Sequence, residues 1–101
     1  MHKLAIKIDS SWIVEFCHRW DIRELSIFGS AIGGTMRADS DVDVLIELSP
    51  GRYPDIDEWD QMREELSKHF GRSADLLSAR GIENPFLRHD VMHNREILYA
   101  A

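Results

Sequence analysis

The chain has 101 residues, 44% hydrophobic and 30% charged, a composition that allows one globular domain, residues 1–101, with one modest core. Its 12 basic and 18 acidic residues give a formal charge of −6. This charge argues against binding to a nucleic-acid polymer, because proteins that bind one usually have a basic surface. No run approaches the ~20 apolar residues of a membrane span, and the single cysteine excludes an internal disulfide, so we expect a cytoplasmic protein without membrane contacts.

The first half of the chain predicts one helix and two strands. The first predicted helix follows an N-cap at Asp9 or Ser10 and should end near Asp21. Its apolar residues recur at helical spacing: Ile13, Phe16, Cys17 and Trp20. Residues 24–28 alternate like a strand that ends at Gly-Ser, and a short helical turn should follow before Gly33. Residues 42–48 are rich in β-branched side chains and stop at a Ser-Pro-Gly turn, which indicates a second strand.

The second half predicts a helix, a short strand and a last helix. The predicted amphipathic helix has Gly71 as its C-cap. Its apolar residues recur at steps of three and four: Trp59, Met62, Leu66 and Phe70. Residues 73–78 are strand-like, and Pro85 after Asn84 opens a helix that we expect to run to about Tyr99. We therefore predict an α/β (α+β) fold, a small mixed sheet with helices packed against it. The side chains of Trp20, Trp59, Phe70 and Phe86 are expected in the core.

Two carboxylates stand at the start of the second predicted strand. Asp41 and Asp43 are two residues apart, so their side chains point to the same face, while Val42, Val44 and Ile46 face the opposite, buried side. Like charges on one face repel each other unless a cation joins them. Hard oxygen ligands suit Mg²⁺ or Mn²⁺, which usually keep waters and phosphate oxygens as further ligands. For a bare Asp-x-Asp, a solvated acidic edge is the commoner explanation.

The Gly29-Ser30 turn favours the metal-site interpretation. Gly29 lets backbone approach a ligand without an intervening Cβ, and Ser30 would offer its hydroxyl and nearby N–H groups to phosphate oxygens. Ten residues separate Ser30 from Asp41, and this combined spacing is far rarer than either motif alone. Candidate nucleotide-binding residues are Gly29, Ser30, Arg37 and Ser40.

This chain carries Gly-Ser, ten further residues and Asp-x-Asp on a strand–turn–helix–strand frame, which resembles the signature of the DNA polymerase β-like nucleotidyltransferases. The chain is similar in length to the minimal nucleotidyltransferases (MNT), antitoxins that pair with HEPN toxins. The segment 71–77 (Gly-Arg-Ser-Ala-Asp-Leu-Leu) looks like the family's strand with a third carboxylate, Asp75, and residues 94–99 look like its last helix.

The resemblance implies a polymerase β-like palm fold and metal-dependent nucleotidyl transfer. Asp41, Asp43 and Asp75 would hold two Mg²⁺ ions and act in catalysis, with Asp75 helping to deprotonate the attacking hydroxyl. Ser30 and its loop would position the phosphates of ATP. AMP would then pass to a protein acceptor, a tyrosine of a HEPN-type toxin, with which the chain would form a hetero-oligomer.

One departure keeps a second function open. The residue after Gly-Ser is commonly Arg in that family, and here it is Ala31, although Arg37 lies further along the loop. The alternative is a catalytically weak or silent antitoxin that neutralises its toxin by occlusion. A transferase acting on an antibiotic or an RNA end is a third hypothesis, against which the lack of an acceptor-holding domain argues.

Two further groups of residues are less informative. His89 and His93 have helical i, i+4 spacing, but neither a zinc-protease Glu nor a cysteine pair accompanies them, so we interpret them as surface histidines. Arg52 and Tyr53 follow the second predicted strand, where a nucleotide contact and plain surface are equally good explanations.

Overall fold

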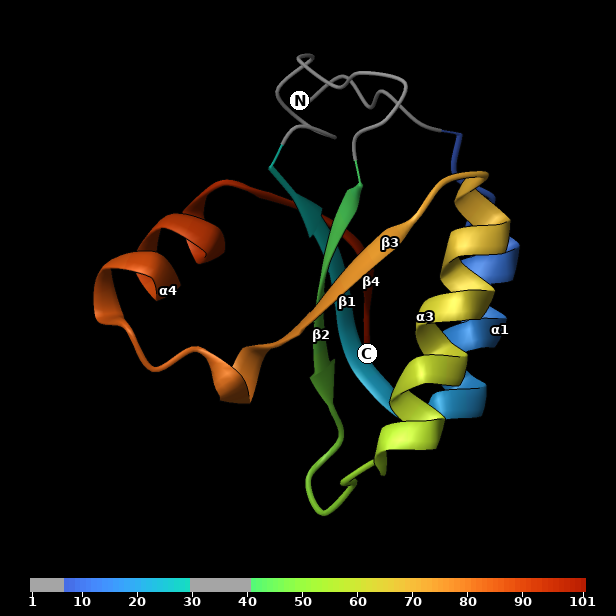
Figure 1. The fold of residues 1–101 in the computed structure, drawn as a ribbon, viewed down its shortest axis with the longest axis horizontal. Helices are drawn as coiled ribbons and strands as arrows, with labels where there is room; N and C mark the ends of the chain where they lie inside the picture. The colour runs from blue at the N-terminus through green and yellow to red at the C-terminus, as the bar shows by residue number, and fades with distance from the viewer. Residues whose placement is uncertain (1–6, 30–40) are drawn as a thin grey trace.

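A computed structural model describes residues 7–29 and 41–101. Four strands form one sheet in the order β3-β2-β1-β4, with β1 antiparallel to both of its neighbours and β2 parallel to β3. Helices α1 and α3 cover one face and α4 the other (Figure 1). The elements in chain order are α1 (Ser10–Trp20), β1 (Ile22–Phe28), β2 (Val42–Leu48), α3 (Ile56–Phe70), β3 (Ala74–Ser78), the 3₁₀ turn η1 (Ala79–Gly81), α4 (Pro85–His93) and β4 (Arg95–Ala100).

The helices begin and end where the sequence carries capping residues. Asp9 accepts hydrogen bonds from the backbone N–H groups of the first turn of α1, and Asp21 ends that helix in the left-handed region. A capping box joins Asp55 and Glu58 at the start of α3, and Gly71 ends it with a φ of 73°. Both helices expected in these regions are therefore confirmed.

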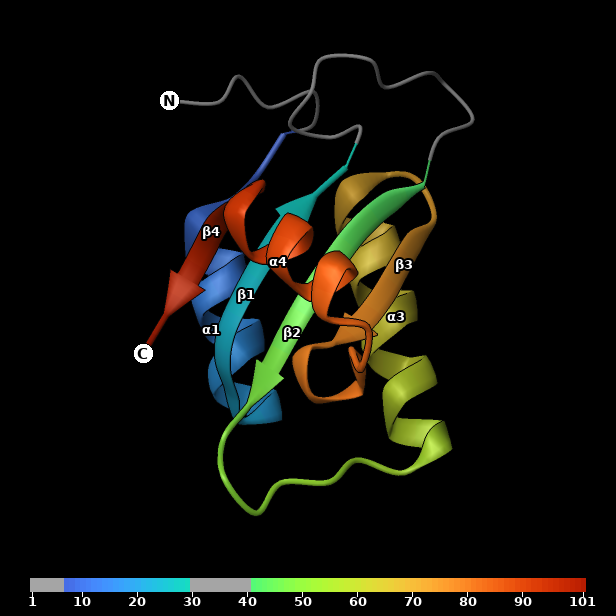
Figure 2. The ribbon, with the colours of Figure 1, turned by 90° about the vertical axis from the view of Figure 1, so that its left-hand side faces the viewer.

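Each face of the sheet has its own apolar cluster. The larger cluster lies between the sheet and α1 and α3, and it includes Phe16, Cys17, Val42, Val44 and Leu66, all fully buried. The smaller one joins Leu45 to Ala79, Ile82 and Val91. It lies on the face of the sheet that α4 covers (Figure 2). Successive side chains of β2 therefore point into different clusters, because neighbouring residues of a strand face opposite sides of the sheet.

The predicted helix from Pro85 to about Tyr99 is wrong in its second half. Helix α4 ends at His93, where the Asn94 side chain donates to the carbonyl oxygen of Asp90 at 2.9 Å. Residues 95–100 form β4, which pairs antiparallel with β1. Because β1 is buried, its outer N–H and C=O groups need partners, and β4 supplies them. The β-prone run Ile-Leu-Tyr suits a strand that packs its side chains on the core.

Smaller differences concern single residues. β1 begins at Ile22 instead of residue 24, and β3 begins at Ala74 instead of residue 73. Phe86, expected in the core, is 85% exposed. Burial raises the pKa of the Cys17 thiol to about 12, which fits its position in the core. In the part of the chain that the structure describes, no helix has the length and apolar character to cross a membrane.

The burial pattern predicts which side chain of α3 stabilises the fold. Leu66 is fully buried, so Leu66→Ala should lower the free energy of unfolding by about 2–5 kcal/mol, because it leaves a cavity. Ile56, at the first position of the same helix, is 87% exposed, and Ile56→Ala should change stability by no more than about 0.5 kcal/mol. Urea unfolding followed by circular dichroism measures both. Equal losses would contradict the assigned core.

Candidate functional site

Parallel pairing of β2 and β3 brings two of the three predicted carboxylates side by side. Asp43 is the second residue of β2 and Asp75 the second residue of β3, and the two are partners in the register. Asp41 immediately precedes β2. Asp43 is half-buried, whereas Asp41 and Asp75 are exposed. The carboxylates therefore lie where β2 and β3 begin, at one end of the sheet (Figure 1).

Gly29 closes the other side of this site. β1 runs antiparallel to β2, so its last residue, Phe28, pairs with Asp43, and Gly29 follows directly. Gly29 has a φ of 71°, and a Cβ built on it would lie 2.5 Å from Asp43 Oδ2. Any side chain here would be strained and would also displace the carboxylate. The glycine is required by a close approach between its own backbone and Asp43.

A serine of α3 fixes the position of Asp75. The Ser67 hydroxyl donates to the carbonyl oxygen of Arg63 at 2.8 Å and accepts from the backbone N–H of Ala74 at 2.9 Å. The backbone N–H of Val42 donates to the carbonyl oxygen of Ser73 at 2.8 Å, which starts the β2–β3 ladder. The residue before Asp75 is thus tied to α3, and β3 is held in register with β2.

The clustering of negative charge changes the proton affinity of Asp43. Burial raises the pKa of this carboxyl above its usual value, and the charges of Asp75 and Asp41 raise it further. All three effects disfavour the ionised form. A cation held between the carboxylates would reverse the two charge effects.

These donors suit a hard divalent cation. Three carboxylates offer only oxygen ligands, and Mg²⁺ usually takes one or two of them together with waters and substrate phosphates, not a complete protein cage. Among the described residues, no group of three or more His, Cys, Asp or Glu side chains is arranged to hold a metal ion. Asp41 and Asp75 are exposed and free to change rotamer, so the donor set fits a metal that binds together with a phosphate ligand.

Not all of the other predicted site residues are among those that the structure describes. Ser30, Arg37 and Ser40, and with them Ala31 and the predicted turn, fall outside the described residues. Arg52 and Tyr53 lie in the loop between β2 and α3, at the opposite end of the sheet from the carboxylates (Figure 1). This position removes them as contacts of a nucleotide bound at Asp43.

The histidines predicted on a helix surface are exposed on α4, as expected. A hydrogen bond joins the Nδ1 atom of His93 to the carbonyl oxygen of His89 at 2.8 Å. Their i, i+4 spacing is therefore explained by contact within one helix.

The family model "Polymerase beta, Nucleotidyltransferase" matches residues 12–101. The chain belongs to this family. The match begins within the first turn of α1 and runs through β4, and it includes Gly29 and all three carboxylates. The mixed sheet with helices packed against it was predicted from the order of the elements, and the nucleotidyltransferase fold was implied by the family resemblance.

Similar proteins agree with this family. The protein adenylyltransferase MntA of Thermococcus cleftensis is 27% identical to this nucleotidyltransferase over 85 residues, which are 84% of this chain and 81% of the relative. A crystal structure of a toxin–antitoxin with AMP-PNP contains a chain with a TM-score of 0.74 at 18% identity, covering 93% of this chain and 75% of that one. A structure of the tri-AMPylated HEPN toxin of Shewanella oneidensis in complex with MNT antitoxin contains a chain with a TM-score of 0.64 at 15% identity, covering 91% of this chain and 70% of that one. The two structures show the same fold.

The burial of Asp43, together with repulsion from Asp75 and Asp41, predicts an unusual dependence of stability on pH. Because the folded-state pKa of Asp43 is raised, its contribution is favourable at low pH and is lost as pH rises through that pKa. In the absence of divalent cations, Asp43→Asn should therefore be more stable than the wild type at pH 7, and the difference should vanish in acid. Urea unfolding at several pH values measures it.

Glu47→Gln, on the same strand, is the control for removing a charge from β2 outside this cluster. A matching gain in that variant would mean that net charge, and not the carboxylate cluster, is responsible. If Asp43→Asn were less stable than the wild type at pH 7 without metal, the proposed repulsion would be absent.

Proposed function

We propose that this chain is a metal-dependent protein adenylyltransferase that moves AMP from ATP to a tyrosine of a HEPN-type toxin and so acts as the antitoxin of the pair. The observation that carries the proposal is the β2–β3 register, which sets Asp75 beside Asp43 while Gly29 closes the same site. Membership in the nucleotidyltransferase family supports the reaction class. The relative named protein adenylyltransferase and the complex with an AMPylated HEPN toxin support the acceptor.

In this proposal Asp41, Asp43 and Asp75 hold two Mg²⁺ ions, which when bound neutralise triphosphate charge and polarise the reacting phosphorus centre. Because Gly29 has no Cβ, its backbone lies directly against the carboxylate of Asp43, which a larger residue would displace. Ser30, Arg37 and Ser40 stay candidates for contacts with the nucleotide.

The reaction is a displacement at the α-phosphorus of ATP. The acceptor hydroxyl oxygen forms a bond to that phosphorus, the bond to the bridging oxygen breaks, and pyrophosphate leaves with the electron pair. Asp75, exposed at the start of β3, takes the hydroxyl proton. Holding both reactants in line in this way removes much of the entropic barrier.

The acidic chain suits a basic protein acceptor, because complementary charge speeds encounter and disfavours wrong partners. The single free, buried cysteine agrees with a cytoplasmic location.

The contact between Gly29 and Asp43 gives a sharp test of the nucleotide site. Gly29→Ala would push a Cβ into Asp43 Oδ2, so affinity for Mg²⁺–ATP in calorimetry should fall by about tenfold or more. Gly51→Ala is the matched control, because Gly51 also has a positive φ, 84°, but nothing lies within 4 Å of its Cβ position. Both variants should lose some stability through backbone strain. Equal loss of ATP affinity in both would contradict the placement of the site.

The paired substitution Asp41→Asn with Asp43→Asn tests the chemistry. Size and shape stay nearly constant while two charges of the metal site disappear. Transfer of labelled AMP to the HEPN-type partner should then fall by about 10²-fold or more, because bound metal supplies several kcal/mol of charge stabilisation. The rate of label incorporation measures the loss.

The same variant separates the enzyme from an occluding antitoxin. If AMP transfer carries the antitoxin function, the folded double variant should still bind its partner but no longer protect cells. Undiminished protection would show that neutralisation works by occlusion, the alternative that Ala31 favours.

A further inference from the structure

A second concave site lies at the end of the sheet opposite the carboxylates. A cavity of about 530 Å³ opens between the β2–α3 loop, the start of α3 and η1. This volume falls in the range of ordinary ligand pockets. Its lining is mostly apolar and aromatic: Leu48, Tyr53, Pro54, Ile56, Trp59 and Gly81.

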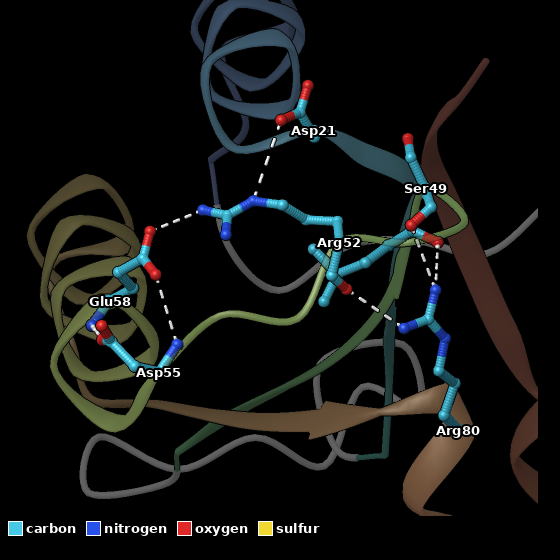
Figure 3. A network of polar contacts seen from close by, with 7 residues as sticks. Asp21, Ser49, Arg52, Asp55, Glu58 and Arg80 are labelled. Carbon is cyan, nitrogen blue, oxygen red and sulfur yellow. Dashed lines mark hydrogen bonds and ion pairs between the residues drawn. The ribbon is translucent and has the colours of Figure 1, made fainter.

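Two arginines hold the walls of this cavity in place (Figure 3). Arg52 pairs with Glu58 at 2.6 Å and with Asp21 at 3.8 Å, which ties the loop to α3 and to the end of α1. Arg80 donates to the carbonyl oxygens of Ser49 and Arg52, each at 3.1 Å. Each guanidinium group is thus engaged in holding protein groups together.

The aromatic wall is fixed by the same network. The guanidinium carbon of Arg80 lies 4.9 Å from the ring centroid of Tyr53, within the range of a cation–π contact. Asp55 and Glu58 form the capping box that starts α3 beside it. The cavity is therefore preformed, and binding there would cost little ordering of the loop.

Two large apolar side chains at this cavity are left in water. Tyr53 is 75% exposed and Ile56 is 87% exposed, although the loop between them is clamped from both sides. Exposed apolar side chains around a preformed hollow mark an interaction site more often than scattered ones do. An incoming apolar side chain would cover both.

The charge around the cavity indicates what carries that side chain. We propose that the cavity docks an apolar side chain presented by a basic segment of a protein partner. Two positive side chains lie at the cavity, those of Arg52 and Arg80. Four carboxylates lie in its lining, in the ion pairs of Arg52 or in the first turn of α3: Asp21, Asp55, Asp57 and Glu58. Because carboxylates outnumber guanidinium groups and the whole chain carries −6, lysines or arginines beside the apolar side chain complete the match.

A second copy of this chain is a poorer occupant. A two-fold contact would bring the same acidic surface against itself, and like charges across an interface oppose association. The proposal is also independent of nucleotidyl transfer. The β2–α3 loop, which lines the cavity, and the start of β2, beside the carboxylates, lie at opposite ends of the sheet (Figure 1).

A short fluorescein-labelled peptide with lysines around a Leu-Phe-Leu centre is the probe. Fluorescence anisotropy should show binding to the full chain that weakens with salt. A peptide with glutamates in place of the lysines, or serines in place of the apolar centre, should bind about tenfold more weakly or not at all. Equal binding of the lysine and glutamate peptides would overturn the charge argument.

Variants place the binding at the cavity. Tyr53→Ser with Ile56→Ser should raise the Kd for the lysine peptide about tenfold or more, while Mg²⁺–ATP binding and stability stay unchanged. Phe86→Ser, on exposed α4, is the matched control and should bind as the wild type does. Equal loss in the control would show a general affinity for exposed apolar surface. A dimer in sedimentation equilibrium that the double variant dissociates would overturn the proposal in favour of a second copy.

Discussion

The parallel pairing of β2 with β3 is the constraint on which the site depends. It places Asp43 beside Asp75, although α3 separates the two strands in sequence. The pairing is unfavourable for the carboxylates: burial raises the pKa of Asp43, and the nearby charges of Asp75 and Asp41 raise it further. On the opposite face of β2, Val42 and Val44 are fully buried against the helices. Apolar burial on one face thus offsets repulsion on the other, and the protein keeps a charged site that a cation can use.

Most of this arrangement could be predicted from the sequence because its signals are local. Asp9 and Gly71 mark helix ends through their own side-chain or backbone properties, so both helices were found. Asp41 and Asp43 share a face by the period of a strand alone. Their proximity to Asp75 could not follow from periodicity, because it depends on which strands pair, and only the family resemblance suggested it.

The failures concern non-local contacts. Residues 95–100 have no strong turn before them, and their strand exists because β1 offers an edge to pair with. Phe86 was expected in the core because of its residue type, but it follows the N-terminal Pro85 on a side of α4 that faces solvent. The cavity beside Tyr53 requires Arg80, which is distant in sequence, to clamp the loop. Ser30, Arg37 and Ser40 lie outside the described residues and stay predictions.

The distance between the two ends of the sheet limits how one partner could use both sites. β2 runs from Val42 beside the carboxylates to Leu48 in the cavity lining, seven residues that span roughly 20 Å. A partner docked at the cavity would therefore leave the carboxylates uncovered by that contact alone, which disfavours simple occlusion through it. Its acceptor hydroxyl would have to reach the carboxylates on an extended segment of at least about six residues, or come from another subunit of the partner. Docking and transfer at separate ends are thus compatible with an enzyme that holds its substrate while the acceptor group moves to the site.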